Sequence, residues 1–124
     1  MNKLLNVLVA LPAVLFLTIG LRWMVAPEGV ATEFGMALDT GLGLSTQIGD
    51  LSAFFLTLGL SMLLALLSRR RVWFYPPIML LGFAALGRVL AWLFHDAALA
   101  PQIGVEVIVA TLLFLASRRL AEDA

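Results

Sequence analysis

Cysteine is absent from this 124-residue sequence, histidine occurs once, and charged residues make up only 13% of the chain. Without cysteine the chain cannot form disulfides, thiolate metal sites or a cysteine-attached haem. A haem held by two histidines would need a second copy of the chain, because His95 stands alone. Eight basic and eight acidic residues cancel, which excludes a strongly basic nucleic-acid binder. We therefore expect no metal site, no cofactor and no nucleic-acid partner.

Apolar residues, by contrast, make up 62% of the sequence and raise its mean hydropathy to +1.04. Soluble domains contain roughly 45–50% apolar and about 25% charged residues, so a disordered tail or a soluble two-domain enzyme is excluded. Four apolar runs reach, or nearly reach, across a hydrocarbon core of ~30 Å when they are helical. They are residues 4–21, 48–67, 72–94 and 101–120.

These runs must be helices if they lie in lipid, because the backbone there has to satisfy its own hydrogen bonds. The sequence thus predicts an all-α integral membrane protein, a single domain over 1–124 built as a four-transmembrane-helix bundle. A short outer-face loop or interfacial helix at 30–34 connects the first two spans, and Ser45 is the predicted N-cap of the second. The first run is too long for a secretory signal, whose apolar part is ~7–15 residues, and is interpreted as a retained span.

Positive charge collects at one end of the predicted bundle. By the positive-inside rule that end is cytoplasmic, so both termini lie inside and the loops 24–47 and 95–100 face outward. The first of these loops contains three acidic residues and no lysine. The basic residues of the cytoplasmic end are Lys3, Arg69, Arg70, Arg71, Arg118 and Arg119.

Five ionisable residues lie inside or at the rim of the apolar runs, namely Arg22, Asp50, Arg88, His95 and Glu106. With the orientation above, all five lie toward the outer side, and each helix brings at least one of them there. A charged side chain in the bilayer is costly, so it normally faces the bundle interior and has a partner. The simplest arrangement places Arg88 between Asp50 and Glu106. Arg22 and His95 then lie above them.

Small residues repeat at every fourth position along the second run, over four helical turns. Such a stripe lets two helices pack closely in lipid, so we expect it, and the neighbouring Asp50, to face the bundle interior. The phenylalanines and methionines are expected to be core or lipid-facing residues. The helix-packing stripe consists of Gly49, Ala53, Thr57, Ser61 and Ala65.

Each member of the polar cluster also has a purely structural interpretation. Asp50 in a first helical turn can complement the helix dipole. Arg22 at a helix end can anchor the helix at the membrane surface, and His95 can be a rim residue in a wet loop. Arg88 and Glu106 can form an ion pair that only sets the helix register. The cluster is therefore either a binding site or a structural network.

Short polar motifs lie in or directly beside all four runs. They are Arg22-Trp23 before Pro27, Gly49-Asp50, Arg88 with Ala91-Trp92 and His95, and Glu106 in the last run. Together they resemble a bacterial family of small membrane proteins, domain-of-unknown-function family 4345, which is distantly DoxX-like. The resemblance covers nearly the whole chain and implies a four-helix bundle in the bacterial cytoplasmic (inner) membrane with an unassigned activity. Some DoxX-like proteins are linked to quinone-associated redox complexes.

Two functions of different class follow from these residues. In the first, an outer-leaflet polar pocket binds a small amphipathic or lipid-like ligand, with Asp50, Glu106 or His95 as the candidate catalytic group for proton transfer. In the second, the chain is an accessory subunit or assembly factor of a larger membrane complex, or a homo-oligomer, and the cluster is structural. A small multidrug exporter is less favoured, because such proteins carry an essential glutamate in the first span and this chain has none there.

Overall fold

The computed structural model describes residues 2–123, and every regular element within that range is a helix. The prediction of an all-α protein is therefore confirmed. The helices are α1 (Asn2–Val25), α2 (Pro27–Glu33), α3 (Gly41–Ser68), the 3-10 helix η1 (Arg71–Phe74), α4 (Tyr75–Phe94) and α5 (Gln102–Arg119).

Three helical stretches are long and apolar enough to cross a membrane, namely α1, α3 and the stretch Arg71–Phe94 formed by η1 and α4. With 24, 28 and 24 residues, at a rise of about 1.5 Å each, they exceed the ~30 Å hydrocarbon core. The last helix, α5, has 18 residues, of which Glu106, Arg118 and Arg119 are charged. A fourth span is therefore not shown by length and composition and stays a prediction.

The N-terminal end of α3 lies earlier in the chain than the sequence predicted. The helix begins at Gly41, so Ser45 lies within its second turn, and the prediction of Ser45 as N-cap was wrong. The Gln47 side chain folds the preceding loop back onto these first turns. Its Oε1 accepts a hydrogen bond from the Asp39 backbone N–H (2.8 Å), and its Nε2 donates to the Ala37 carbonyl (3.1 Å). These two hydrogen bonds attach the loop residues Ala37 and Asp39 to the N-terminal part of α3.

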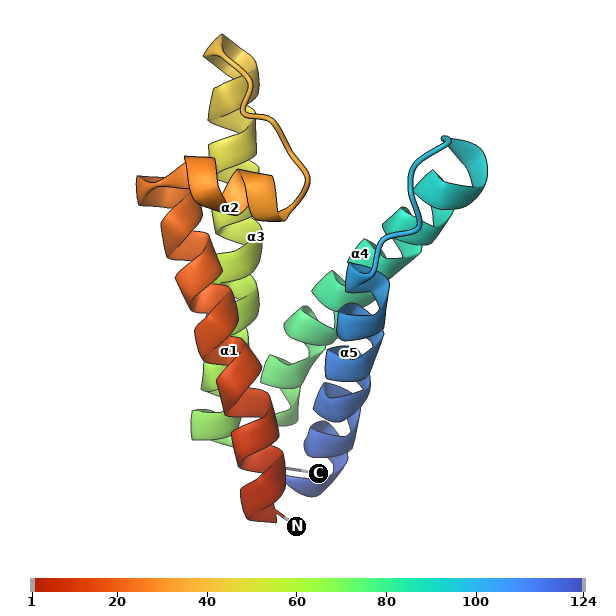
Figure 1. Cartoon of the computed structure of the whole chain (residues 1–124). Coiled ribbons are helices and arrows are strands. Elements are labelled where there is room, and N and C mark those ends of the chain that lie inside the picture. The colour runs from red at the N-terminus through yellow and green to blue at the C-terminus, as the bar shows by residue number, and fades with distance from the viewer. Residues whose placement is uncertain (1, 124) are drawn as a thin grey trace.

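A short helix, α2, lies between α1 and α3, in the connecting segment where the sequence predicted one. It spans Pro27–Glu33 rather than 30–34, because proline suits a first helical position, where its missing N–H costs nothing. In Figure 1, α2 crosses the end of α1 and lies over α3. Val30 and Ala31 are buried, so this face of α2 belongs to the core.

The long helices pack as two pairs. The helix α1 lies along α3, α4 lies along α5, and Figure 1 shows the pairs meeting near the termini and diverging toward the opposite end. At the joined end, the Glu122 N–H donates to the Arg69 carbonyl (2.8 Å) and the Arg71 N–H donates to Asp123 Oδ1 (2.8 Å). The buried side chains near this end include Val9, Met62, Phe74, Leu113 and Ala116.

Two glycines allow α1 and α3 to approach closely. A Cβ added to Gly59 would lie 2.7 Å from the Ala13 carbonyl oxygen, and one added to Gly20 would lie 2.9 Å from the Leu56 backbone nitrogen. Backbone atoms cannot turn away as the end of a flexible side chain can. Close contact between the two helices therefore requires glycine at both positions.

The predicted small-residue stripe of α3 is only partly buried. Ser61 and Ala65 are buried, whereas Gly49, Ala53 and Thr57 are exposed. The expectation that the whole stripe faces inward was therefore wrong. The physical reason is that α1 packs against another face of α3, because Gly59, at the point of closest contact, lies about 200° around the helix from Thr57 and from Ser61.

Substitution of Gly59 by alanine is expected to destabilise the protein by about 1–3 kcal/mol, because the new methyl group would overlap α1 backbone atoms. Gly49→Ala is the matched control on the same helix, since a Cβ there meets nothing within 4 Å. It should be neutral or stabilising by up to about 1 kcal/mol through helix propensity. Thermal unfolding of both variants in detergent measures the difference, and equal melting temperatures would contradict the proposed close contact.

Candidate functional site

One ion pair lies in the apolar part of the structure. Arg88 Nε on α4 donates a hydrogen bond to Glu106 Oε2 on α5 at 3.0 Å. The Glu106 side chain is only 10% exposed and that of Arg88 33%. The acids of the other two ion pairs in residues 2–123 are exposed. Arg88 and Glu106 thus form the one ion pair in this range that has a buried carboxylate.

The pair leaves hydrogen-bonding capacity unused. Glu106 Oε1 is buried and has no hydrogen-bond partner among the described residues. Of the Arg88 nitrogens, only Nε donates to another residue in that part of the chain. Buried polar atoms are normally paired, because desolvating one without a partner costs about 1–3 kcal/mol. A ligand with a suitable polar group could complete this arrangement.

A cavity of about 150 Å³ adjoins the pair, and apart from Gln102 its remaining wall is apolar. Side chains from both helix pairs contribute to it, so it lies between them. Examples are Ile19 of α1, Leu58 of α3 and Val105 of α5. A second, more open hollow of about 450 Å³ shares part of this wall and is therefore its neighbour. The shared residues are Phe34, Phe54, Phe55, Arg88 and Glu106.

Three phenylalanines form the aromatic part of the shared wall. The Phe55 ring packs edge-on against Phe34, with the centroids 5.3 Å apart, and against Phe54, with the centroids 5.0 Å apart. Sequence reasoning assigned such residues only to the core or the lipid surface and so missed this role. The signal that could have identified it is the pair Phe54-Phe55, because consecutive helical residues point about 100° apart and cover a broad face.

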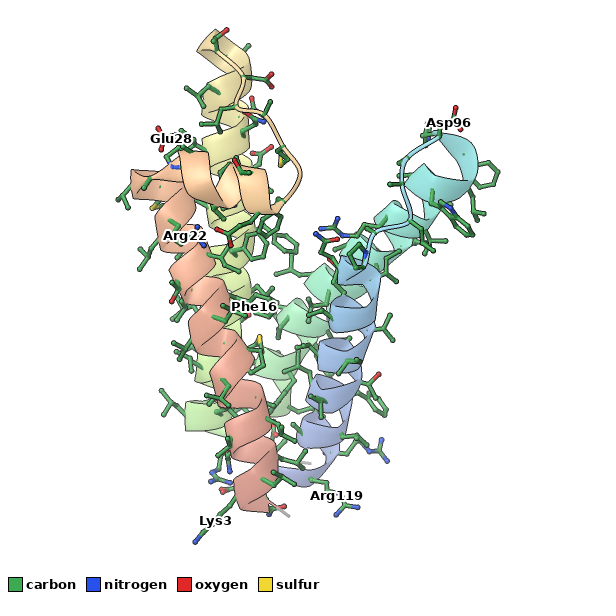
Figure 2. The ribbon with its side chains drawn as sticks, viewed as in Figure 1. Lys3, Phe16, Arg22, Glu28, Asp96 and Arg119 are labelled. Carbon is green, nitrogen blue, oxygen red and sulfur yellow. The ribbon has the colours of Figure 1, made fainter. Side chains whose placement is uncertain are left out.

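Three residues of the predicted polar cluster lie away from the pair. Asp50 is exposed on α3, and its carboxylate makes no ion pair within residues 2–123. His95 is the exposed C-cap of α4. The predicted placement of Arg88 between Asp50 and Glu106 is not formed, because α3 and α4 diverge toward this end (Figure 1). Arg22 lies at the end of α1, beside α2 (Figure 2). Only Arg88 and Glu106 meet as expected.

Arg22 forms an ion pair with Glu33, one of the three acidic residues of the loop 24–47. No partner was predicted for this acid from the sequence. The two terminal nitrogens of Arg22 each donate to a carboxylate oxygen of Glu33, Nη1 at 3.3 Å to Oε1. The hydrogen bond from Arg22 holds the pKa of the Glu33 carboxyl below its usual range. Glu33 ends α2 and Phe34 follows it directly. The ion pair links α2 to α1, and Phe34, the next residue after Glu33, lines the cavity.

Among residues 2–123, no three His, Asp or Glu side chains are grouped as a metal site requires. Of the candidate catalytic residues, only Glu106 lines the cavity. Comparisons with protein-family models, with curated proteins and with solved structures give no match for this chain. The resemblance to domain-of-unknown-function family 4345 therefore stays a prediction.

Arg88→Met is expected to destabilise the protein more than Glu106→Met. The first change leaves a buried carboxylate without its cation, whereas the second leaves a guanidinium that is one-third exposed and can turn toward water. We expect losses of about 2–4 and about 1–2 kcal/mol, respectively, and a smaller loss for the double variant than for Arg88→Met. A double-mutant cycle of unfolding free energies in detergent measures the coupling. Additive losses would show that the two residues act independently.

Proposed function

We propose that this chain is an integral membrane protein that binds a small amphipathic or lipid-like ligand in the cavity between its two helix pairs. The observation that carries the proposal is the incompletely paired Arg88 and Glu106 on an apolar cavity wall. An apolar pocket with a few convergent polar groups is typical of small-ligand sites. A pair that served packing alone would be expected to satisfy its buried carboxylate fully.

The proposal includes four spans with both termini in the cytoplasm. The chain after α5 is bonded to Arg69 and Arg71 at the end of α3. If α1, α3 and α4 cross the membrane, α5 must cross it as well to return to this end. Figure 2 supports the orientation, because Lys3 and Arg119 lie at the end with the termini. Glu28 and Asp96 lie at the opposite end in the same view.

The depth of the ion pair suits an amphipathic ligand that enters from the outer leaflet. Arg88 precedes the last residue of α4, Phe94, by six residues, or about 9 Å along the helix. Glu106 follows the first residue of α5 by four residues, or about 6 Å. In a four-span orientation, both side chains lie one to two helical turns below the outer surface. A ligand could place its polar head at the pair and keep its apolar part in the hydrocarbon.

Binding needs fewer groups than catalysis of proton transfer. Asp50 and His95 line none of the three hollows that include Glu106. A proton transfer would therefore rest on Glu106 alone among the predicted catalytic candidates. The cavity wall and the ion pair suffice for binding, so we propose a binding function.

The alternative function is an accessory subunit or assembly factor in which Arg88 and Glu106 only set the helix register. It predicts that the cavity takes up no ligand and that a stoichiometric membrane partner is retained in mild detergent. The unpaired Glu106 Oε1 favours the binding function over this alternative. The resemblance to a bacterial family supports a location in the bacterial cytoplasmic membrane under either function.

The four-span topology predicts which single cysteines can be labelled from outside the cell. The chain contains no cysteine, so one introduced thiol reports its own position. Thr40→Cys and Ala97→Cys should react with a membrane-impermeant maleimide in intact cells, whereas Ser68→Cys and Glu122→Cys should react only after permeabilisation. All four positions are exposed. Labelling of Glu122→Cys in intact cells, with Ser68→Cys protected, would contradict a crossing by α5.

Filling the cavity is expected to abolish ligand binding without unfolding the protein. Val105→Trp projects a large ring into the cavity wall, whereas Ile108→Trp is the matched control on α5 because Ile108 lines none of the three hollows that include Glu106. Both residues are more than half exposed. The measurement is saturable photolabelling of the protein in phosphatidylcholine nanodiscs by a diazirine-bearing hexadecyl probe, mapped by mass spectrometry.

Saturable labelling near Phe34 and Phe54 in the unaltered protein and in Ile108→Trp, with at least about tenfold less in Val105→Trp, supports the binding function. Equal labelling of the two tryptophan variants, or labelling that never saturates, would contradict it and favour the accessory-subunit alternative.

A further inference from the structure

The unused hydrogen-bonding atoms of Arg88 and Glu106, beside a cavity whose wall also includes the Gln102 amide, indicate which chemical group can complete the ion pair. Glu106 Oε1 can only accept a hydrogen bond while the carboxylate is ionised, and it is buried without a donor among the described residues. The terminal nitrogens of Arg88 can only donate. A ligand that satisfies both side chains must therefore present a donor and an acceptor within the same small head.

The charges of Arg88 and Glu106 also restrict which head group the ligand can carry. Arg88 and Glu106 are in direct contact and neutralise one another. An anionic head would face the Glu106 carboxylate and offer it no donor, and a cationic head would face the guanidinium and offer it no acceptor. Charges placed next to like charges in an interface cost several kcal/mol. A hydroxyl group both donates and accepts and carries no charge.

The apolar walls describe the rest of the ligand. A cavity of about 150 Å³ is large enough for a group of the size of benzene, so it accommodates the head and the first part of an apolar body. The neighbouring hollow of about 450 Å³ lies between α3 and α4 and includes Phe83, which is 70% exposed. It therefore reaches the lateral surface of the protein, where a longer tail can pass into the bilayer.

We propose that the ligand is a neutral, hydroxyl-bearing amphiphile with one apolar chain, whose hydroxyl donates to Glu106 Oε1 and accepts from a terminal nitrogen of Arg88. Its chain leaves the cavity laterally between α3 and α4. This inference rests on the proposed binding function and adds to it the chemistry of the head. Arg88 and Glu106 are then specificity-determining residues, because Arg88 offers free donors and Glu106 an unpaired acceptor that a turn of its side chain brings to the cavity surface.

The test is a comparison of four molecules that share one chain and differ in the head. Hexadecanol, hexadecanoate, hexadecylamine and methyl hexadecanoate compete with the diazirine-bearing hexadecyl probe for the full chain in phosphatidylcholine nanodiscs. We expect hexadecanol to compete at a concentration at least about tenfold lower than hexadecanoate or hexadecylamine. Methyl hexadecanoate accepts but does not donate, so it should also be weaker than hexadecanol.

Single neutralising substitutions should change the order of preference in opposite directions. Glu106→Gln leaves the Arg88 charge uncompensated, so hexadecanoate should become the strongest competitor. Arg88→Gln leaves the Glu106 charge uncompensated, so hexadecylamine should become the strongest. The double variant Arg88→Gln/Glu106→Gln, which carries neither charge, should again prefer hexadecanol. Asp50→Asn is the matched control, because Asp50 lines none of the three hollows that include Glu106, and the order of preference of this variant should equal that of the unaltered protein.

The outcomes separate this inference from the binding function on which it rests. If an ionic head or the ester binds most tightly to the unaltered protein, or if all heads compete equally, the hydroxyl assignment is wrong while cavity binding stands. If no molecule competes and the probe does not label the cavity saturably, the binding function itself is wrong. Should one single variant not fold, the ranking in the unaltered protein and in the double variant still decides.

Discussion

Glu106 lies on α5 among apolar side chains, and Arg88 of α4 supplies its one hydrogen bond within residues 2–123. An ionised carboxylate buried without a cation costs several kcal/mol, so this contact allows α5 to carry an acid at that depth. It also ties the C-terminal half of α4 to the N-terminal half of α5. No ion pair ties these two helices to α1 or α3 at the same depth in the described chain. The space between the pairs is thus left as a cavity.

The two helix pairs are held together by different interactions. The helices α1 and α3 approach closely at Gly20 and Gly59 and are stabilised by dispersion over their length. The helices α4 and α5 share the buried ion pair. The pairs are bonded to one another where the chain after α5 meets Arg69 and Arg71, near the termini. Because this connection lies at one end, the pairs diverge toward the other, as Figure 1 shows.

The choice of arginine at position 88 matters for the proposed site. A guanidinium can use Nε for Glu106 and keep its two terminal nitrogens available for a second group, whereas a lysine ammonium is a single compact donor centre. The same side chain can therefore neutralise the buried acid and contact a ligand. Phe34, another residue of the cavity wall, packs against Trp23 and Phe55 and directly follows Glu33, the partner of Arg22.

The sequence by itself determined the helical class, because apolar runs of this length satisfy their backbone in lipid only as helices. It also identified Arg88 and Glu106 as residues that need partners, since neither stands at a cap or an interface. Hydropathy and residue spacing do not give the distances between helices. Those distances decide which ionisable side chains form ion pairs. Asp50 stays exposed because α3 turns its Gly59 face to α1 and diverges from α4. Only the tertiary structure could decide that the cluster is one pair beside a cavity, because partner choice depends on which helix faces lie within reach.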